Sequence, residues 1–166
     1  MAEGMKIMIQ YTCCFSGHRS IEEIHLKSLK DNLQNEIISL IQQKMQYFIC
    51  GGALGFDTLA AQTVIALKKL YSHIHLTLML PCRDQDKYWK KCDQQVYQAI
   101  LDQADKIRYI SEYYYRGCMH KRNKLLVDSS CYCVCYLTKE KGGTAFTVNY
   151  ARKKGLNIIN LADRLT

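Results

Sequence analysis

Short loops in this 166-residue chain combine glycine with arginine, two residue types that together suit the binding of an anion. Glycine lets backbone N–H groups approach a ligand closely, and the planar fork of arginine grips phosphate or carboxylate in two hydrogen bonds. The candidate ligand-binding residues in these loops are Gly17, His18, Arg19, Gly51, Gly52, Gly55, Asp57, Arg83, Gln85, Arg116, Arg122, Gly142 and Gly143.

These residues also have plainer explanations. Glycine makes the tight turns that connect strands to helices, and Arg83 and Arg116, taken singly, fit solvated loop positions. His18 either donates a hydrogen bond to a ligand or caps a helix, and Asp57 either accepts from ribose hydroxyls or stabilises a helix dipole. For Arg19 and Arg122 we favour a role in binding.

Short apolar runs alternate with longer segments of helical period, which is typical of a parallel α/β fold. The expected strands are 11–15, 47–50, 75–80, 106–110, 131–136 and 157–161. The expected helices are a long one from an N-cap at Ser20 to Leu40, followed by 59–70, 89–103, 119–127 and 144–154. Pro81 is expected to end the third strand, because proline has no N–H to donate.

This order of elements favours a doubly wound, mostly parallel Rossmann-like sheet in three layers, with strand order 3-2-1-4-5-6. In such a sheet a ligand binds beyond the carboxyl ends of the strands, where the winding direction reverses between strands 1 and 4. Seven of the nine glycines follow the expected carboxyl ends. We therefore expect the candidate residues to surround one crevice at that edge.

Other ligand signatures are missing from the sequence. It contains neither the dinucleotide fingerprint G-x-G-x-x-G nor the phosphate loop G-x-x-x-x-G-K-[ST]. Cys131, Cys133 and Cys135 alternate along one expected strand and lack the loop spacing of zinc ligands, so we predict no metal site and read the cysteines as small core residues. Tyr113–Tyr115 and Trp89 either stack on a nucleobase or, in the interpretation we favour, cover the core.

The chain carries 23 Lys+Arg against 15 Asp+Glu, a formal net charge of +8 that favours an anionic partner. Most lysines fall on expected helix faces, so nucleic acid is an open but not the preferred partner. The length predicts a single domain over 1–166, with 1–10 as a loosely ordered leader. The sequence shows no secretory signal and no apolar stretch that could span a membrane, and the odd cysteine count fits a reducing compartment, so we expect a cytoplasmic protein without a membrane partner. A homo-oligomer stays open.

Several consecutive segments resemble the YpsA-like family, formerly DUF1273. The first three are Thr12-Cys13-Cys14-Phe15-Ser16-Gly17-His18-Arg19, the stretch 48–61 around Gly51-Gly52-Ala53-Leu54-Gly55-Phe56-Asp57, and Leu80-Pro81-Cys82-Arg83-Asp84-Gln85 with Trp89. The later ones are Gly117-Cys118-Met119 leading to Arg122-Asn123, then Leu126-Val127-Asp128-Ser129, and Gly142-Gly143-Thr144-Ala145 with Tyr150-Ala151. Ser20 is a minor departure, since proline is common there.

This family belongs to the SLOG superfamily, whose Rossmann-like members include the LOG phosphoribohydrolases and the DNA-processing protein DprA. The resemblance implies a pocket for a nucleotide-derived ligand and adds Ser16, Asn123, Asp128 and Thr144 to the candidate binding residues. It also implies a role for Arg122, because 119–122 is similar to the LOG segment that supplies a catalytic arginine. Thr147, however, stands at the position of the acid that ends the LOG loop P-G-G-x-G-T-x-x-E, and threonine cannot supply that carboxylate. Hydrolysis by the LOG mechanism would therefore require Asp57 or Asp128 to take over the role of that acid.

Three hypotheses about function follow. The first, which we favour, is the binding or sensing of a phosphate-bearing ligand of the NAD, ADP-ribose or nucleoside monophosphate class, with no further cofactor assigned. The second is a nucleotide N-glycosidase that uses Arg122, against which Thr147 argues. The third is a binder of single-stranded nucleic acid like DprA. Catalytic residues stay unassigned.

Overall fold

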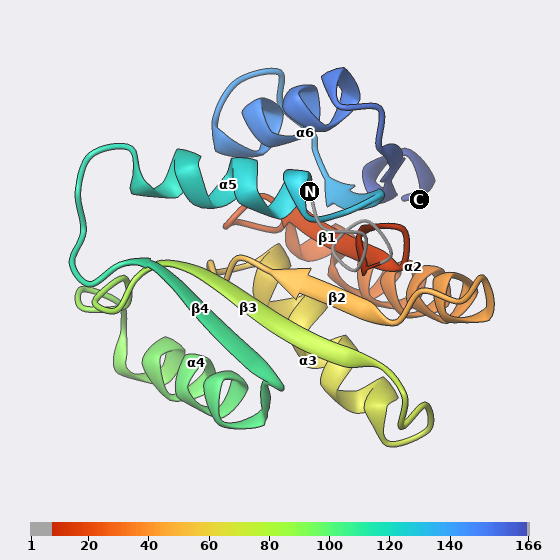
Figure 1. Cartoon of the computed structure of the whole chain (residues 1–166), viewed down its shortest axis with the longest axis horizontal. Coiled ribbons are helices and arrows are strands. Elements are labelled where there is room, and N and C mark those ends of the chain that lie inside the picture. Colours follow the sequence, from red (N-terminus) through yellow and green to blue (C-terminus); the bar gives the residue numbers. More distant parts are fainter. Residues whose placement is uncertain (1–7, 166) are drawn as a thin grey trace.

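The computed structural model describes residues 8–165, and its centre is one parallel sheet of six strands (Figure 1). The strands are β1 (Thr12–Gly17), β2 (Tyr47–Cys50), β3 (His75–Cys82), β4 (Lys106–Ser111), β5 (Tyr132–Tyr136) and β6 (Asn157–Asn160). The helices are α2 (Glu23–Gln42), α3 (Phe56–Lys68), α4 (Lys91–Gln103), α5 (Cys118–Asp128) and α6 (Gly143–Lys153), and a 3-10 helix, η1 (Leu161–Arg164), follows β6.

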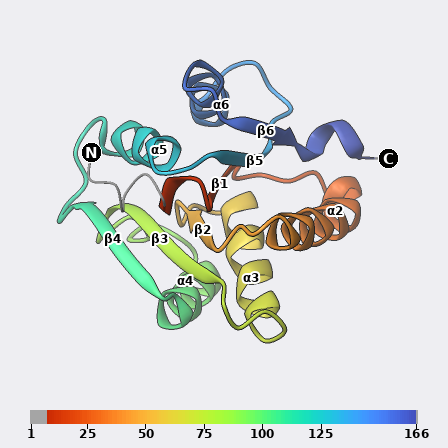
Figure 2. The same ribbon diagram turned by 45° about the vertical axis from the view of Figure 1, so that its right-hand side comes forward.

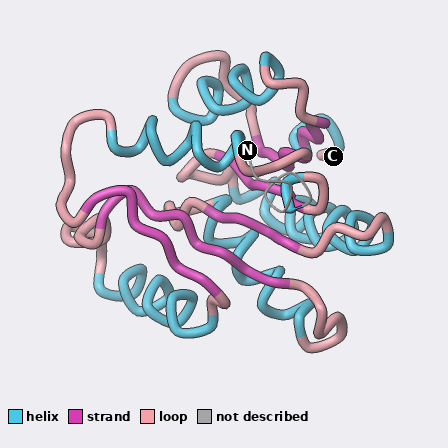
Figure 3. The backbone as a smooth tube through the Cα atoms, viewed as in Figure 1, coloured by secondary structure: helices cyan, strands magenta, loops and turns pink. Residues whose placement is uncertain are grey.

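The helices cover the sheet on both faces, as Figures 1 and 2 show from two directions and Figure 3 by element type. Helices α2, α3 and α4 pack on one face, and α5 and α6 pack on the other. Side chains alternate between these layers along each strand, so that Phe15 contributes to the core under α2 and α3 while Cys14 contributes to the core under α5 and α6. The expected doubly wound, three-layer α/β fold is therefore confirmed.

The predicted helix α2 shows why these segments fold as they do. Its apolar residues Leu29, Leu33, Ile37 and Leu40 recur every three or four positions, and all four are fully buried. A stripe of this width faces the sheet and drives the helix onto it.

The order of the strands differs from the prediction in one place. The observed order is β4-β3-β2-β1-β5-β6, so β4 lies at the edge beside β3 instead of beside β1. The sequence carries the reason, because Lys106 and Arg108 alternate along β4 and are exposed, and charges of this kind are typical of an edge strand. The winding direction therefore reverses between β1 and β5.

Two smaller expectations were wrong. Ser20 does not cap α2, because the helix begins at Glu23 after Glu22, and no side chain there accepts a capping hydrogen bond. Pro81 does not end β3, which continues to Cys82. Leu80 and Cys82 pair with Tyr109 and Ser111, and Pro81 occupies the position between these pairs.

The expected leader at 1–10 lies mostly outside the described residues, of which the first is Met8. Among residues 8–165, no helix is both long and apolar enough to cross a bilayer.

Candidate functional site

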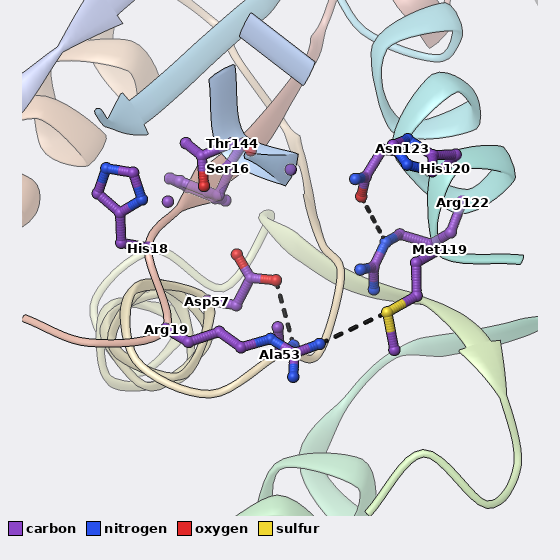
Figure 4. Close-up of a pocket in the computed structure, with 13 residues that line it drawn as sticks. Ser16, His18, Arg19, Ala53, Asp57, Met119, His120, Arg122, Asn123 and Thr144 are labelled. Atoms are coloured by element: carbon purple, nitrogen blue, oxygen red, sulfur yellow. Dashed lines mark hydrogen bonds between the residues drawn. The ribbon is translucent and has the colours of Figure 1, made fainter. Parts of the chain in front are cut away.

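A cavity of about 360 Å³ opens at the carboxyl edge of the sheet, around the end of β1 (Figure 4). Nine of the candidate residues line it. The end of β1 contributes Ser16 and Gly17, and the turn after it contributes His18 and Arg19. The N-terminal halves of three helices contribute Asp57 from α3, Arg122 and Asn123 from α5, and Gly143 and Thr144 from α6.

Close backbone approach holds the β1 turn against α3. A Cβ on Gly17 would lie 2.3 Å from the Phe56 ring, and a Cβ on Gly55 would lie 2.3 Å from the carbonyl oxygen of Arg19. Gly55 also has a φ of +76°, which residues with side chains rarely adopt. In addition, the Phe56 N–H donates to the carbonyl oxygen of His18 over 3.1 Å. These contacts bring the start of α3 beside the β1 turn.

Arg122 is buried at the inner end of the cavity, with only 5 % of its surface exposed. Its Nη1 donates to the carbonyl oxygen of Gly51, and its Nε donates to Oδ1 of Asn123 over 2.7 Å. Burial lowers the pKa of the guanidinium from its ordinary value, and nearby Asp57 opposes that shift. The side chain thus ties α5 to the loop after β2.

Asp57 is the buried acid of the cavity and is 6 % exposed. The backbone N–H of Ala53 donates to its Oδ2 over 3.2 Å. Burial raises the pKa of this carboxyl group to about 6, although Arg122 and the Ala53 N–H both act to lower it. Gly51 lies between acid and arginine: a Cβ there would be 2.9 Å from Oδ2 of Asp57 and 2.8 Å from Nη1 of Arg122.

His18 has a role that neither sequence-based alternative described. Its Nε2 accepts a hydrogen bond from the backbone N–H of Thr138 over 2.9 Å, which joins the β1 turn to the loop after β5. Burial and the neighbouring charge of Lys139 lower the pKa of the imidazole. Because Nε2 accepts from a backbone N–H, the ring in this geometry is neutral, with its proton on Nδ1.

Arg19 is exposed at the mouth of the cavity. Its Nη2 contacts Sδ of Met119 at 3.5 Å, a weak partner that leaves most guanidinium donors available (Figure 4). Of the two arginines that line the cavity, Arg19 is thus the one whose charge faces solvent.

Four other candidate side chains do not line the cavity. Arg83 pairs with Glu112 at 2.8 Å, and Arg116 is exposed in the loop before α5. Gln85 donates to Tyr97 and to the carbonyl oxygen of Gly52. Asp128 accepts a 2.8 Å hydrogen bond from Tyr150 and lines a separate hollow with Thr12 and Tyr47, at the amino ends of β1 and β2.

The remaining candidate glycines shape the loops behind the cavity. Gly52 and Gly142 have φ values of +70° and +107°, and Gly51 provides the carbonyl oxygen that Arg122 binds. None of these three lines the cavity itself.

Four lining residues were not among the predicted binding residues: Phe15, Ala53, Met119 and His120. For Met119 and His120 a signal was present, because they lie in the first turn of α5, directly before the turn that carries Arg122. Thr147, which stands at the position of the LOG acid, is buried and donates to the carbonyl oxygen of Gly143 over 2.9 Å. It does not line the cavity.

Among residues 8–165, no cluster of three or more His, Cys, Asp or Glu side chains could hold a metal ion. Seven cysteines are buried, while Cys131 is partly exposed and Cys92 is exposed. Cys133 and Cys135 pack under α5 and α6 with Cys14, which confirms their interpretation as core residues.

Comparison with known proteins places this architecture in a family. Residues 13–160 match the model of the YspA SLOG family. The chain belongs to this family. It is 36 % identical over 138 residues to the SPbeta prophage-derived protein YoqJ of Bacillus subtilis, covering 75 % of this chain and 81 % of that protein. It is 31 % identical over 135 residues to a UPF0398 protein of Brevibacillus brevis, covering 80 % of this chain and 72 % of the relative.

Two solved structures share the fold of this SLOG chain. DNA processing protein A (DprA) from Streptococcus pneumoniae aligns with a TM-score of 0.66 at 15 % identity, covering 92 % of this chain and half of that one. The DprA from Helicobacter pylori is described as having a single-stranded DNA binding mode. It aligns with a TM-score of 0.64 at 20 % identity, covering 95 % of this chain and 67 % of that one. At these identities the likeness concerns the fold.

Proposed function

We propose that the cavity binds a nucleotide-derived, phosphate-bearing small molecule. The observation that carries this proposal is that the exposed Arg19 and the first turn of α6 line the same cavity, at the point where the winding reverses. Parallel sheets of this type bind ligands at that point, and a helix N-terminus attracts phosphate. A cavity of about 360 Å³ lies within the range of small-molecule sites.

The polar groups of the cavity divide between two parts of such a ligand. The hydroxyls of Ser16 and Thr144, the N-terminus of α6 and Arg19 suit the phosphate. The carboxylate of Asp57, which lines the same cavity, suits a ribose hydroxyl as its acceptor. The SLOG family membership supports a ligand of the NAD, ADP-ribose or nucleoside monophosphate class.

The proposal is tested by identifying what the protein carries when purified. The protein is denatured, and the released small molecules are analysed by mass spectrometry, with Arg19→Ala prepared in parallel. We expect a phosphate-bearing nucleotide derivative from the wild-type protein and less of it from the variant. Arg83→Ala is the matched control, because Arg83 is paired with Glu112 outside the cavity. Equal recovery from all three proteins would place the ligand elsewhere.

A second candidate function is hydrolysis of the bound nucleotide at its N-glycosidic bond. The observation that favours it is Asp57, a buried acid in the cavity whose pKa of about 6 suits proton transfer near neutral pH. The Thr147 hydroxyl donates to the Gly143 carbonyl oxygen within α6 and does not line the cavity. Asp57 is the carboxyl group lining the cavity that could serve as the acid in this hydrolysis.

The second candidate is tested by assaying free base and ribose phosphate with AMP, GMP, CMP and NAD. Turnover that Asp57→Asn abolishes while nucleotide still binds would support it. Binding without turnover of any of the four compounds would leave the protein as a binding or sensing domain.

A further inference from the structure

Arg122 fixes the direction in which Asn123 presents its amide group. A guanidinium carries only donors, so the atom of Asn123 that meets Nε of Arg122 at 2.7 Å must be the oxygen. The amide nitrogen of Asn123 then turns away from Arg122. In Figure 4 Asn123 lies across the cavity from Ser16 and Thr144, and its amide nitrogen is on the side that faces them.

The same hydrogen bonds leave Arg122 less able to grip a ligand. Two of its three nitrogens already donate within the protein, one to the Gly51 carbonyl oxygen and one to Asn123. The side chain is 5 % exposed, and withdrawing it toward a ligand would leave the Gly51 carbonyl oxygen and Asn123 without their donor. The geometry suits holding neighbours in place rather than a two-bond grip on phosphate.

Asn123, in contrast to Arg122, has N–H donors that are not engaged within the protein. It is partly buried, lines the cavity and carries two N–H donors on its nitrogen. No acceptor among residues 8–165 takes up these donors, and Nδ2 is not one of the buried polar atoms that lack a partner, so it is open to solvent in the cavity. A ligand oxygen that accepts from Nδ2 therefore replaces water and breaks no hydrogen bond within the protein.

We infer that Asn123 is a ligand-binding residue that donates from Nδ2 to an oxygen acceptor of the ligand, and that Arg122 is the positioning residue that sets this orientation. The inference rests on the proposed function and sharpens it. At this position the site selects a ligand that presents an acceptor, such as a phosphoryl oxygen, and rejects one that presents a donor.

The test separates donation from the structural role of Asn123. Asn123→Asp keeps an oxygen for Nε of Arg122 but has no N–H to donate, whereas Asn123→Ala loses both functions without adding charge. Asn149→Asp is the matched charge control, because Asn149 is exposed on α6 and does not line the cavity. Affinity for AMP and ADP-ribose is measured by calorimetry for each protein.

The added charge of Asn123→Asp is controlled by Asn123→Ala, which loses the same N–H donors without adding a charge. We expect Asn123→Ala to bind about tenfold more weakly than wild type, because the hydrogen bond to the ligand is lost. Asn123→Asp should bind at least as weakly, because it lacks the donors and its carboxylate also repels a phosphate in contact with it. Asn149→Asp should bind as the wild type does.

Each other result decides against the inference. Wild-type affinity of Asn123→Asp would show that only the oxygen of Asn123 matters, which overturns the donor role and leaves the proposed function standing. Loss in Asn123→Asp alone, with Asn123→Ala unaffected, would assign the effect to charge. If the wild-type protein binds neither probe, the proposed function fails and this inference with it.

Discussion

At the scale of single residues, the cavity depends on two buried charges that the sequence places far apart. Asp57 and Arg122 are each less than one-tenth exposed, and both border the space that a Cβ at position 51 would occupy. Burial works against the charged form of each, and the attraction between them works in its favour. The free energy of unfolding should therefore depend on pH and on the size of the side chain at position 51.

The pH dependence has a definite sign. The pKa of Asp57 is about 6 in the folded protein against an ordinary 3.8, so the folded state holds this proton more tightly than the unfolded state does. Between these two values the free energy of unfolding falls as pH rises, by on the order of 3 kcal/mol from this group. Denaturant unfolding at several pH values should show a shallower fall for Asp57→Asn than for wild type. Identical slopes would contradict the assignment, and exposed Asp31→Asn serves as the control.

Residue 51 is the second test at this scale. In Gly51→Ala the new Cβ would lie 2.8 Å from Arg122 and 2.9 Å from Asp57, so both must move. We expect a loss of about 1–3 kcal/mol in the free energy of unfolding. Gly143→Ala is the matched control, because a Cβ there meets no atom within 4 Å and alanine favours a helix. Equal stability of the two variants would show that the packing at Gly51 is loose.

At the scale of elements, the loops at the carboxyl edge are held to one another. His18 in the β1 turn accepts from Thr138 in the loop that leads to α6, and Arg122 on α5 donates to the Gly51 carbonyl oxygen after β2. These two hydrogen bonds connect four strand ends or helix starts around the cavity. The site is therefore positioned before any ligand arrives.

His18→Ala tests this connection. Without the imidazole acceptor, the Thr138 N–H loses its partner, and we expect its hydrogen exchange to accelerate about fivefold, as the loss of a hydrogen bond worth about 1 kcal/mol predicts. Exchange measured by NMR should rise in residues 137–142 and stay unchanged in β1. His73→Ala, at an exposed position, is the control. An unchanged rate at Thr138 would mean that the loop is held by other contacts.

The elements also show what the sequence could predict. The strands and helices were predictable within a few residues, because apolar period and glycine position decide them locally. The position of β4 in the strand order was predicted wrongly. It depends on which position in the assembled sheet leaves Lys106 and Arg108 in contact with water, and that is the edge beside β3. The same limit applies to the site. Glycine loops indicated the right edge, but the positions of Arg83, Gln85, Arg116 and Asp128 outside the cavity follow from their partners in space.

At the scale of the whole molecule, the reversal of winding places the cavity between two halves of the sheet. Strands β1 to β4 run outward in one direction, and β5 and β6 run outward in the other. The cavity takes residues from both halves, from the β1 turn and α3 on one side and from α6 on the other. The central claim is that this cavity binds a phosphate-bearing nucleotide derivative, with the cation of Arg19 at its mouth.

The most direct test is a calorimetric titration of AMP and ADP-ribose into wild type, Arg19→Ala and Arg83→Ala. One site per chain is expected for the wild type and for Arg83→Ala, with affinity about tenfold weaker in Arg19→Ala because a charged hydrogen bond to phosphate is lost. No binding heat for either ligand, or equal affinity in all three proteins, would contradict the account.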